Sequence, residues 1–304
     1  MNLRYILAAG ILVAGISAQA AITQRSAAVG ELAAYCAPAS RPASHDIVFM
    51  PDGTSYVERS DDGKRLLVKD INTGKELSVL FDVTHTRETE LTDFEGFIVS
   101  PDASKVMVWR ESEHVYRRST TARYYVYEVR SRLLRPLSKE HDRQRDPLFS
   151  PDSRMVAFVA DNNIYAAKLD YQTEVPVTTD GVRDSVINGA TDWTYEEEFG
   201  VTSLMTWAPD NLTLCYVRFD ESAVPMYSLP LYQGTCEPKD QYRLYPGSLS
   251  YKYPVAGEPN SAVSVHSYDV ETRKTKQIDF PGGTPYYIPC LKYGPDPSRL
   301  MVAT

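Results

Sequence analysis

The sequence predicts an all-β protein, specifically an incomplete β-propeller with about four to five blades of four-stranded antiparallel sheet. Tyr and Pro are abundant, at 21 and 20 residues among 304, and these residue types favour strands and turns. The dipeptide Pro-Asp recurs beside apolar runs, with successive aspartates 50, 50, 58 and 86 positions apart. A repeat of about 50 residues is the size of one propeller blade, whereas a β-sandwich does not repeat a turn at a fixed interval. The repeated aspartates are Asp52, Asp102, Asp152, Asp210 and Asp296.

The first 20 residues are predicted to be a secretory signal peptide. Residues 5–16 form an apolar run that is too short for a bilayer, which needs roughly 20 residues. The small-residue triplet Ala18-Gln19-Ala20 follows it, as a cleavage site would. We therefore expect an exported protein, periplasmic or extracellular, with a lead-in segment over 21–44 and the partial propeller over 45–304.

The net charge limits the possible partners, and the cysteines limit the possible disulfides. The formal net charge is −8 at pH 7, whereas nucleic acids and anionic membrane surfaces need a positive face, so we expect neither as a partner. Export permits disulfides among Cys36, Cys215, Cys236 and Cys290, and their spacing leaves all pairings open. Cys215 lies in an apolar run and is expected to be a buried small hydrophobe.

The cleanest copy of the repeat follows Pro151-Asp152. Proline restricts φ and aspartate can accept a hydrogen bond from the backbone two residues on, so the pair predicts a tight turn. A strand is expected over 155–160, a second turn over 161–163 and a second strand over 164–169. The corresponding strands of the two earlier copies are expected at 65–70 and 124–129.

The two longer intervals predict insertions, one around residues 188–199 and the other between residues 227 and 259. The last copy of the repeat ends at Thr304, inside the strand that should follow its turn. A sheet edge would be left open there. We therefore expect a chain that is truncated at its C-terminus and belongs to a longer protein.

The first insertion carries the residues that point to a function. Asp192 is a suitable helix N-cap, and residues 193–198 are expected to form a short helix that contains Glu196, Glu197 and Glu198. Acids near a helix N-terminus stabilise it by some 0.3–1 kcal/mol each, but three consecutive charges repel one another. A bound cation would offset this repulsion. An ammonium about 4 Å from a carboxylate gains on the order of 4 kcal/mol at an effective dielectric constant of 20.

The segment Asp192-Trp-Thr-Tyr-Glu-Glu-Glu198 closely resembles the double-glutamate motif of the dipeptidyl peptidase IV family, in the prolyl oligopeptidase superfamily. The similarity extends over about residues 45–304, with features of the bacterial members. The further matching segments are Trp207–Asp210, Tyr216–Asp220, Val224-Pro225, Tyr253-Pro254, 256–261 and Tyr287–Pro289.

The resemblance implies an eight-bladed propeller that covers an α/β-hydrolase domain in a serine exopeptidase. Such enzymes release N-terminal dipeptides, preferably X-Pro or X-Ala. By position, Glu197 and Glu198 match the pair that binds the α-ammonium of the substrate. Arg117 matches the arginine that binds the carbonyl of the first substrate residue, and Arg118 is its immediate neighbour. The alternative for Arg117 is a solvated loop arginine.

The chain departs from the family in lacking the catalytic part. It contains no Gly-x-Ser-x-Gly nucleophile elbow, so the hydrolase domain and its Ser, Asp and His are expected to be absent and the chain is expected to be non-catalytic alone. Its five histidines do not have the spacing of a metal site, and no metal or cofactor is expected. The implied partners are peptides with a free N-terminus, the missing hydrolase domain and, since family members often dimerise, a second copy of the full-length protein.

Two other readings stay open at this point. The chain could be a non-catalytic exported propeller that binds protein or peptide partners. It could also come from a peptidase of the same superfamily with another specificity, although such relatives usually lack the paired glutamates.

Overall fold

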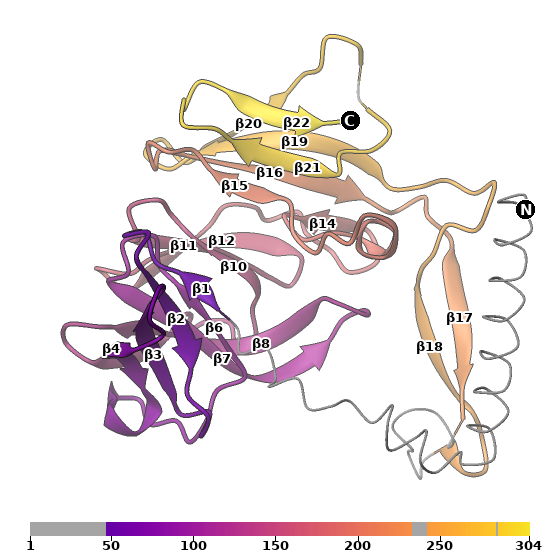
Figure 1. Ribbon diagram of the computed structural model, residues 1–304. Coiled ribbons are helices and arrows are strands. Elements are labelled where there is room, and N and C mark those ends of the chain that lie inside the picture. Colours follow the sequence, from indigo (N-terminus) through magenta and orange to yellow (C-terminus); the bar gives the residue numbers. More distant parts are fainter. Residues whose placement is uncertain (1–46, 233–241, 284) are drawn as a thin grey trace, which may run out of the picture. The chain divides into compact units, whose positions relative to one another are not determined.

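The computed structural model describes residues 47–232, 242–283 and 285–304. The chain divides into two compact units, Met1–Ile47 and Val48–Thr304, and the second contains the described strands (Figure 1). The predicted signal peptide, the lead-in segment, Cys36 and Cys236 lie outside the described residues.

The first two sheets are antiparallel meanders of consecutive strands, apart from the short strand β5, which pairs in parallel with β9. A 3-10 turn, η1 (Val83–His85), connects the two sheets. The first sheet consists of β1 (Val48–Phe49), β2 (Ser55–Arg59), β3 (Arg65–Asp70) and β4 (Glu76–Asp82). The second consists of β5 (Arg87–Glu88), β6 (Gly96–Val99), β7 (Lys105–His114), β8 (Thr120–Glu128) and β9 (Leu133–Pro136).

The third and fourth sheets continue the repeat, and the strands predicted at 155–160 and 164–169 are confirmed, the second shifted by one residue. The third sheet consists of β10 (Arg145–Phe149), β11 (Met155–Ala160), β12 (Asn163–Lys168) and β13 (Thr173–Pro176). The fourth consists of β14 (Val186–Asn188), β15 (Met205–Trp207), β16 (Thr213–Asp220), β19 (Ala262–Asp269) and β20 (Lys274–Ile278). The strands β21 (Cys290–Tyr293) and β22 (Leu300–Ala303) form a further antiparallel hairpin.

Four successive sheets and one further hairpin confirm the predicted propeller of about four to five blades. The apolar core lies between neighbouring sheets, and β11 shows why. All six of its residues are buried. Ala157 belongs to a cluster with Leu214 of the fourth sheet, whereas Phe158 belongs to a cluster with Met107 of the second. Since alternate side chains of a strand point to opposite faces, this sheet is apolar on both faces.

The Pro-Asp turns have the predicted hydrogen bonds. The carboxylate of each repeated aspartate accepts a hydrogen bond of 2.8–3.1 Å from the backbone N–H two residues on. Turns of successive sheets are also joined, because the backbone N–H of Asp152 donates to the side chain of Asn211 at 2.8 Å. The repeat seen in the sequence is therefore a repeat of one local structure.

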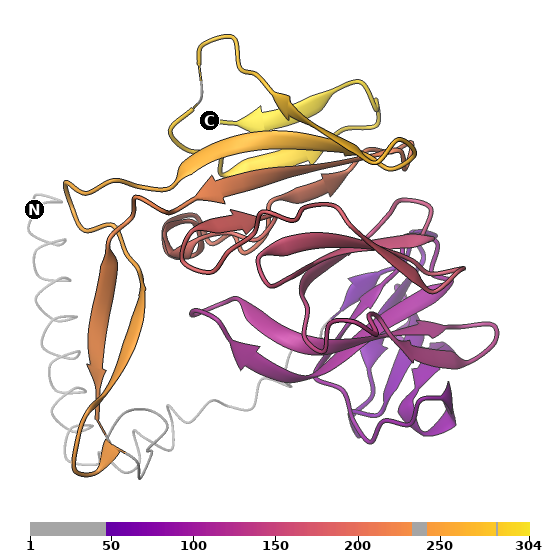
Figure 2. The ribbon, with the colours of Figure 1, turned by 180° about the vertical axis from the view of Figure 1, so that it is seen from behind.

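Both predicted insertions are present in the fourth sheet. The first, between β14 and β15, contains a short helix, η2 (Tyr195–Phe199), whose hydrogen bonds have the wider π spacing. The second contains the antiparallel hairpin of β17 (Met226–Leu231) and β18 (Gly247–Lys252), which extends away from the sheets in both views (Figure 2).

One further sequence expectation concerns Cys215, which is fully buried, as predicted. Among the described residues, Cys215 and Cys290 form no disulfide. In the part of the chain that the structure describes, no helix is long and apolar enough to cross a membrane.

Candidate functional site: an acidic helix beside an arginine hairpin

The helical run over residues 193–199, which includes η2 and is called the acidic helix below, is capped by Asp192, as the sequence predicts. Oδ1 of this buried residue accepts a hydrogen bond from the backbone N–H of Tyr195 at 2.9 Å. Its Oδ2 accepts a hydrogen bond of 2.6 Å from the hydroxyl of Ser261, which directly precedes β19. Burial raises the pKa of the Asp192 carboxyl, and these hydrogen bonds oppose that rise. The start of the helix is therefore tied to a neighbouring strand through one buried side chain.

Tyr195 attaches the helix to the core. Its side chain is buried, its ring packs edge-on against Phe219 with the centroids 4.8 Å apart, and its hydroxyl accepts a hydrogen bond of 2.7 Å from the backbone N–H of Ile288. The helix ends at Gly200, whose φ of 67° lies in the left-handed region that glycine adopts readily. The helix between Tyr195 and Gly200 is therefore held against the core by the Tyr195 side chain.

The three consecutive glutamates occupy three different environments, because successive side chains on a helix point in different directions. Glu196 is fully buried, and its Oε1 accepts the backbone N–H groups of Arg118 and, at 3.0 Å, Ser119. Glu197 is 15% exposed, and its Oε1 lies 3.2 Å from Nε of Arg117. Glu198 is exposed and has no hydrogen bond or ion pair within the described ranges.

Arg117 lies at the tip of the hairpin between β7 and β8, which we call the arginine hairpin; the tip consists of residues 115–119. The backbone N–H of Val115 donates to the carbonyl of Ser119 at 2.9 Å and closes this tip. The Arg117 side chain is 72% exposed, so one edge of the guanidinium contacts Glu197 and the rest faces solvent. Of the two neighbouring arginines, Arg117 is the one whose side chain pairs with the helix. The structure thus brings Arg117, Glu197 and Glu198 to one place, and their binding roles stay predictions.

Aromatic rings line the site on the side of β17 and β18. The ring of Trp193 lies 4.2 Å from that of Tyr253, and the ring of Tyr116, next to Arg117, lies 6.0 Å from that of Tyr251. Burial, with the negative charges of Glu221 and Asp192, raises the pKa of Tyr116. The rings therefore join the arginine hairpin, the helix and the β17–β18 hairpin.

Glu221 is a buried acid that the sequence analysis did not single out. It follows β16 directly, is 3% exposed, and its Oε2 is buried without a hydrogen-bond partner among the described residues. Burial and the negative charges of Asp192 and Asp184 raise its pKa to about 7. Its only sequence signal is a carboxylate at the end of an apolar strand.

The hairpin tip also borders a cavity of about 400 Å³ that is lined by Arg118, Ser119 and Thr120. Asp146 also lines this cavity, accepts a hydrogen bond of 3.0 Å from the Thr202 hydroxyl and pairs with Arg145 at 2.9 Å. Burial raises the pKa of Asp146, and the charge of Glu196 adds to that rise. The space beneath the tip of the arginine hairpin therefore has a buried acid on a lining that also includes Ile98, Leu148 and Met205.

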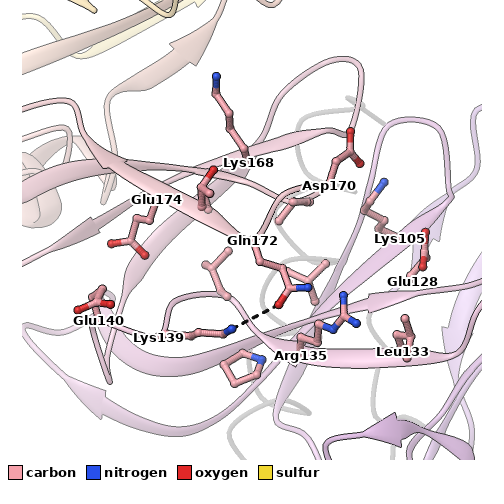
Figure 3. A pocket seen from close by; sticks show the side chains of 16 residues that line it. Lys105, Glu128, Leu133, Arg135, Lys139, Glu140, Lys168, Asp170, Gln172 and Glu174 are labelled. Atoms are coloured by element: carbon pink, nitrogen blue, oxygen red, sulfur yellow. Dashed lines mark hydrogen bonds between the residues drawn. The ribbon is translucent and has the colours of Figure 1, made fainter.

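A second concavity, of about 370 Å³, lies between β8 and β9 of the second sheet and β12 and β13 of the third (Figure 3). We call it the charged cleft. The hydrogen bond from Lys139 Nζ to Gln172 Oε1 crosses it at 3.4 Å. No residue of the acidic helix lines it, and none of residues 115–119 at the tip of the arginine hairpin does. Its charged residues are Lys105, Glu128, Arg135, Lys139, Glu140, Lys168, Asp170 and Glu174.

No group of three or more His, Cys, Asp or Glu side chains in the described part of the chain is arranged to hold a metal ion. The chemistry that the site offers is therefore that of carboxylates and a guanidinium: two acids, one paired with arginine and one open to solvent, beside an aromatic wall.

Comparisons with known proteins identify relatives of this chain. Residues 100–304 match the family described as the dipeptidyl peptidase IV (DPP IV) N-terminal region. The probable dipeptidyl-aminopeptidase B of Aspergillus niger is 33% identical over 259 residues, which are 79% of this chain and 29% of that protein. The one of Emericella nidulans is 36% identical over 188 residues, 60% of this chain and 21% of the relative.

Two solved structures are also similar. The crystal structure of Porphyromonas gingivalis dipeptidyl peptidase 4 matches with a TM-score of 0.79 and 43% identity, over 86% of this chain and 36% of that one. A putative dipeptidyl aminopeptidase IV from Bacteroides ovatus matches with a TM-score of 0.56 and 18% identity, over 85% of this chain and 34% of that one, and supports the fold alone. The chain thus spans less than a third of the fungal relatives and little more than a third of the bacterial structures.

Proposed function

Because the chain belongs to the family of the dipeptidyl peptidase IV N-terminal region, we propose that it is the substrate-binding propeller of an exported serine dipeptidyl peptidase. The resemblance inferred from Asp192–Glu198 is confirmed at the level of the family, and the identity to the bacterial structure, 43%, exceeds the 33% to the A. niger relative. The proposed substrates are peptides with a free N-terminus, from which X-Pro or X-Ala dipeptides are removed.

The observation that carries the proposal is the pairing of Arg117 with Glu197 beside Glu198, which is exposed and has no partner among the residues that the structure describes. An α-ammonium is a compact cation with three N–H donors, and the two carboxylates offer it oxygens from two directions. Burial of Glu197 strengthens the attraction, because the local dielectric constant is lower than that of water. We therefore assign the ammonium to Glu197 and Glu198.

Arg117 has a second role in the proposal. A guanidinium has five N–H donors, and the contact with Glu197 uses one edge. The exposed donors are free to bind the carbonyl of the first substrate residue. With the N-terminus and this carbonyl held, the chain of the substrate extends by at most about 3.6 Å per residue, so only the second peptide bond is presented to the nucleophile.

The nucleophile itself is proposed to come from a hydrolase domain outside these 304 residues. The sequence contains no Gly-x-Ser-x-Gly elbow, so this chain supplies binding and selection of the N-terminus, and the hydrolase domain supplies the Ser, His and Asp that cleave the bond. Export is part of the proposal and rests on the apolar segment 5–16 and the triplet after it.

The test uses the complete protein that contains this chain. Release of a chromogenic group from a Gly-Pro or Ala-Pro conjugate is measured with the N-terminus free and with it acetylated. We expect cleavage of the free conjugate only. Because hydrogen bonds to charged groups contribute about 1.5–3 kcal/mol each, Glu197→Gln and Glu198→Gln should each lower kcat/KM by roughly 10- to 150-fold.

The matched control is Glu140→Gln, which neutralises an exposed acid in the charged cleft and should leave kcat/KM within about twofold. Equal cleavage of the acetylated conjugate, or equal activity of all three variants, would contradict the ammonium assignment. Absence of any cleavage would favour a non-catalytic propeller.

A further inference from the structure

The first glutamate of the acidic helix has contacts that the binding of an ammonium does not use. The Glu196 side chain is fully buried, and its Oε1 accepts the backbone N–H groups of Arg118 and Ser119. These are the two residues that follow Arg117, and they lie 78 and 77 positions before Glu196 in the sequence. A single carboxylate oxygen therefore joins the acidic helix to the backbone of the arginine hairpin.

The side chain of Arg117 alone would hold this hairpin poorly. It is 72% exposed, and its ion pair with Glu197 at 3.2 Å is accessible to water, so solvent and salt screen the attraction. The bond that closes the tip, from Val115 to Ser119 at 2.9 Å, lies within the hairpin and sets its shape but not its position against the helix.

Glu196, by contrast, is held by the core. Its backbone N–H donates to the carbonyl of Asp192 at 3.2 Å, and the Asp192 carboxylate is itself bound by the Ser261 hydroxyl. The preceding residue, Tyr195, is attached to Ile288. Hydrogen bonds to an ionised acceptor are roughly twice as strong as neutral ones, and they are stronger still where water is excluded.

We propose that Glu196 is a positioning residue that ties the backbone of the β7–β8 tip to the acidic helix, so that Arg117 meets Glu197 and stays beside Glu198. The three consecutive glutamates then have separate tasks: the first holds the hairpin, the second pairs with the arginine, and the third faces the ligand. What Arg117 and the acids bind rests on the proposed function, but the tie itself does not.

The tie is tested first without any substrate, by hydrogen exchange of the complete protein. Peptides that cover residues 115–119 are compared in the wild type, Glu196→Leu, which removes the acceptor, and Glu196→Gln, which keeps a neutral one. We expect exchange at Arg118 and Ser119 to be at least about tenfold faster in the Leu variant and intermediate in the Gln variant. The matched control is Glu198→Gln, on the same helix, which should not change exchange at these two amides.

Two outcomes of the exchange experiment would overturn the proposal. One is unchanged protection of residues 118 and 119 in the Leu variant. The other is an equal loss of protection in β11, because Glu196 would then support the fold as a whole. If Glu196→Leu does not fold, Glu196→Gln decides, with at least about threefold faster exchange expected at the tip only.

The consequence for binding is tested by a double-mutant cycle with the Gly-Pro conjugate. Glu196→Gln should raise KM several-fold with kcat changed less than about twofold, and should add less than about twofold when Arg117 is already Ala, because both changes affect the same contact. Equal losses in both backgrounds would contradict action through Arg117. If the wild-type protein cleaves no dipeptide, the proposed function fails, and the exchange experiment still decides the role of Glu196.

Discussion

The acidic helix and the charged cleft both gather acids and bases, but they differ in how the charges are supported. In the cleft, Lys139 and Glu140 are exposed, and the bond from Lys139 to Gln172 is long, at 3.4 Å. In the acidic helix, the exposed Glu198 is preceded by Asp192 and Glu196, whose side chains are buried and hydrogen-bonded. Buried hydrogen-bonded carboxylates hold a surface charge in one place, whereas exposed charges are free to move and are screened. The two regions therefore differ in the buried support beneath their charges more than in the number of charges.

Glu221 gives the largest expected effect, on stability. Its pKa in the folded protein is about 7, against an ordinary value of 4.5, so the folded state binds this proton more tightly than the unfolded state. Its contribution to stability is therefore fully present below about pH 4.5 and is lost as the pH rises through 7. At 1.36 kcal/mol per pKa unit, Glu221→Gln should raise the free energy of unfolding by up to about 3 kcal/mol at pH 8, with no gain at pH 4.5.

Urea denaturation of both proteins across this pH range measures the effect. Glu140→Gln in the charged cleft is the control and should stay within about 0.5 kcal/mol of the wild type at pH 8, as exposed substitutions do. Parallel pH dependences of the wild type and Glu221→Gln would show that Glu221 is not a buried acid of this kind.

The base of the helix should be the next most sensitive feature. Ser261→Ala removes the hydroxyl that donates to Oδ2 of the buried Asp192 and leaves that carboxylate with one fewer partner. An unsatisfied buried acceptor costs about 1–3 kcal/mol, so we expect the free energy of unfolding to fall by about 2 kcal/mol in urea. Ser228→Ala is the control, because its bond to Ser250 lies exposed on the β17–β18 hairpin. A smaller loss of unfolding free energy for Ser261→Ala than for Ser228→Ala would contradict the inference that buried hydrogen bonds support the acidic helix.

Arg117→Ala should affect binding more than folding. It removes the guanidinium beside Glu197, and we expect kcat/KM for a free-amine Gly-Pro conjugate to fall about tenfold or more, about 1.4 kcal/mol, while the melting temperature changes little. Arg135→Ala, which removes a cleft arginine paired with Glu88, should leave kcat/KM within about twofold. A larger loss in Arg118→Ala than in Arg117→Ala would transfer the role to the neighbouring arginine.

The smallest effect is expected for Lys139→Ala in the charged cleft. The lysine is exposed and makes one long hydrogen bond across the cleft, so the melting temperature should change by less than about 2 °C, and kcat/KM should not change. A marked loss of activity would mean that the cleft takes part in substrate binding. Thermal melts and the same conjugate assay give both readouts.

The repeat and the place of the acidic helix could be predicted from local sequence, but the arrangement of its acids could not. The turn at Asp152 and the strand over 155–160 were both found where expected, and Asp192 caps the helix as predicted. From the sequence, Glu196 is only the residue before the matched pair, Glu197 and Glu198. Its burial follows from the direction in which the wide π-helical turn points it, and no composition or spacing in the sequence specifies that direction.

By itself, then, the sequence determined the blade repeat, the short helix and the three acids on it, because turn chemistry, period-two alternation and capping depend on residues a few positions apart. The tertiary structure alone decided which acid is buried, which one pairs with Arg117 and which one is free. Those outcomes depend on contacts between Glu196 and Arg118, 78 positions apart, and between Asp192 and Ser261, 69 positions apart. Contacts at such separations form only when successive sheets pack together and bury the groups between them.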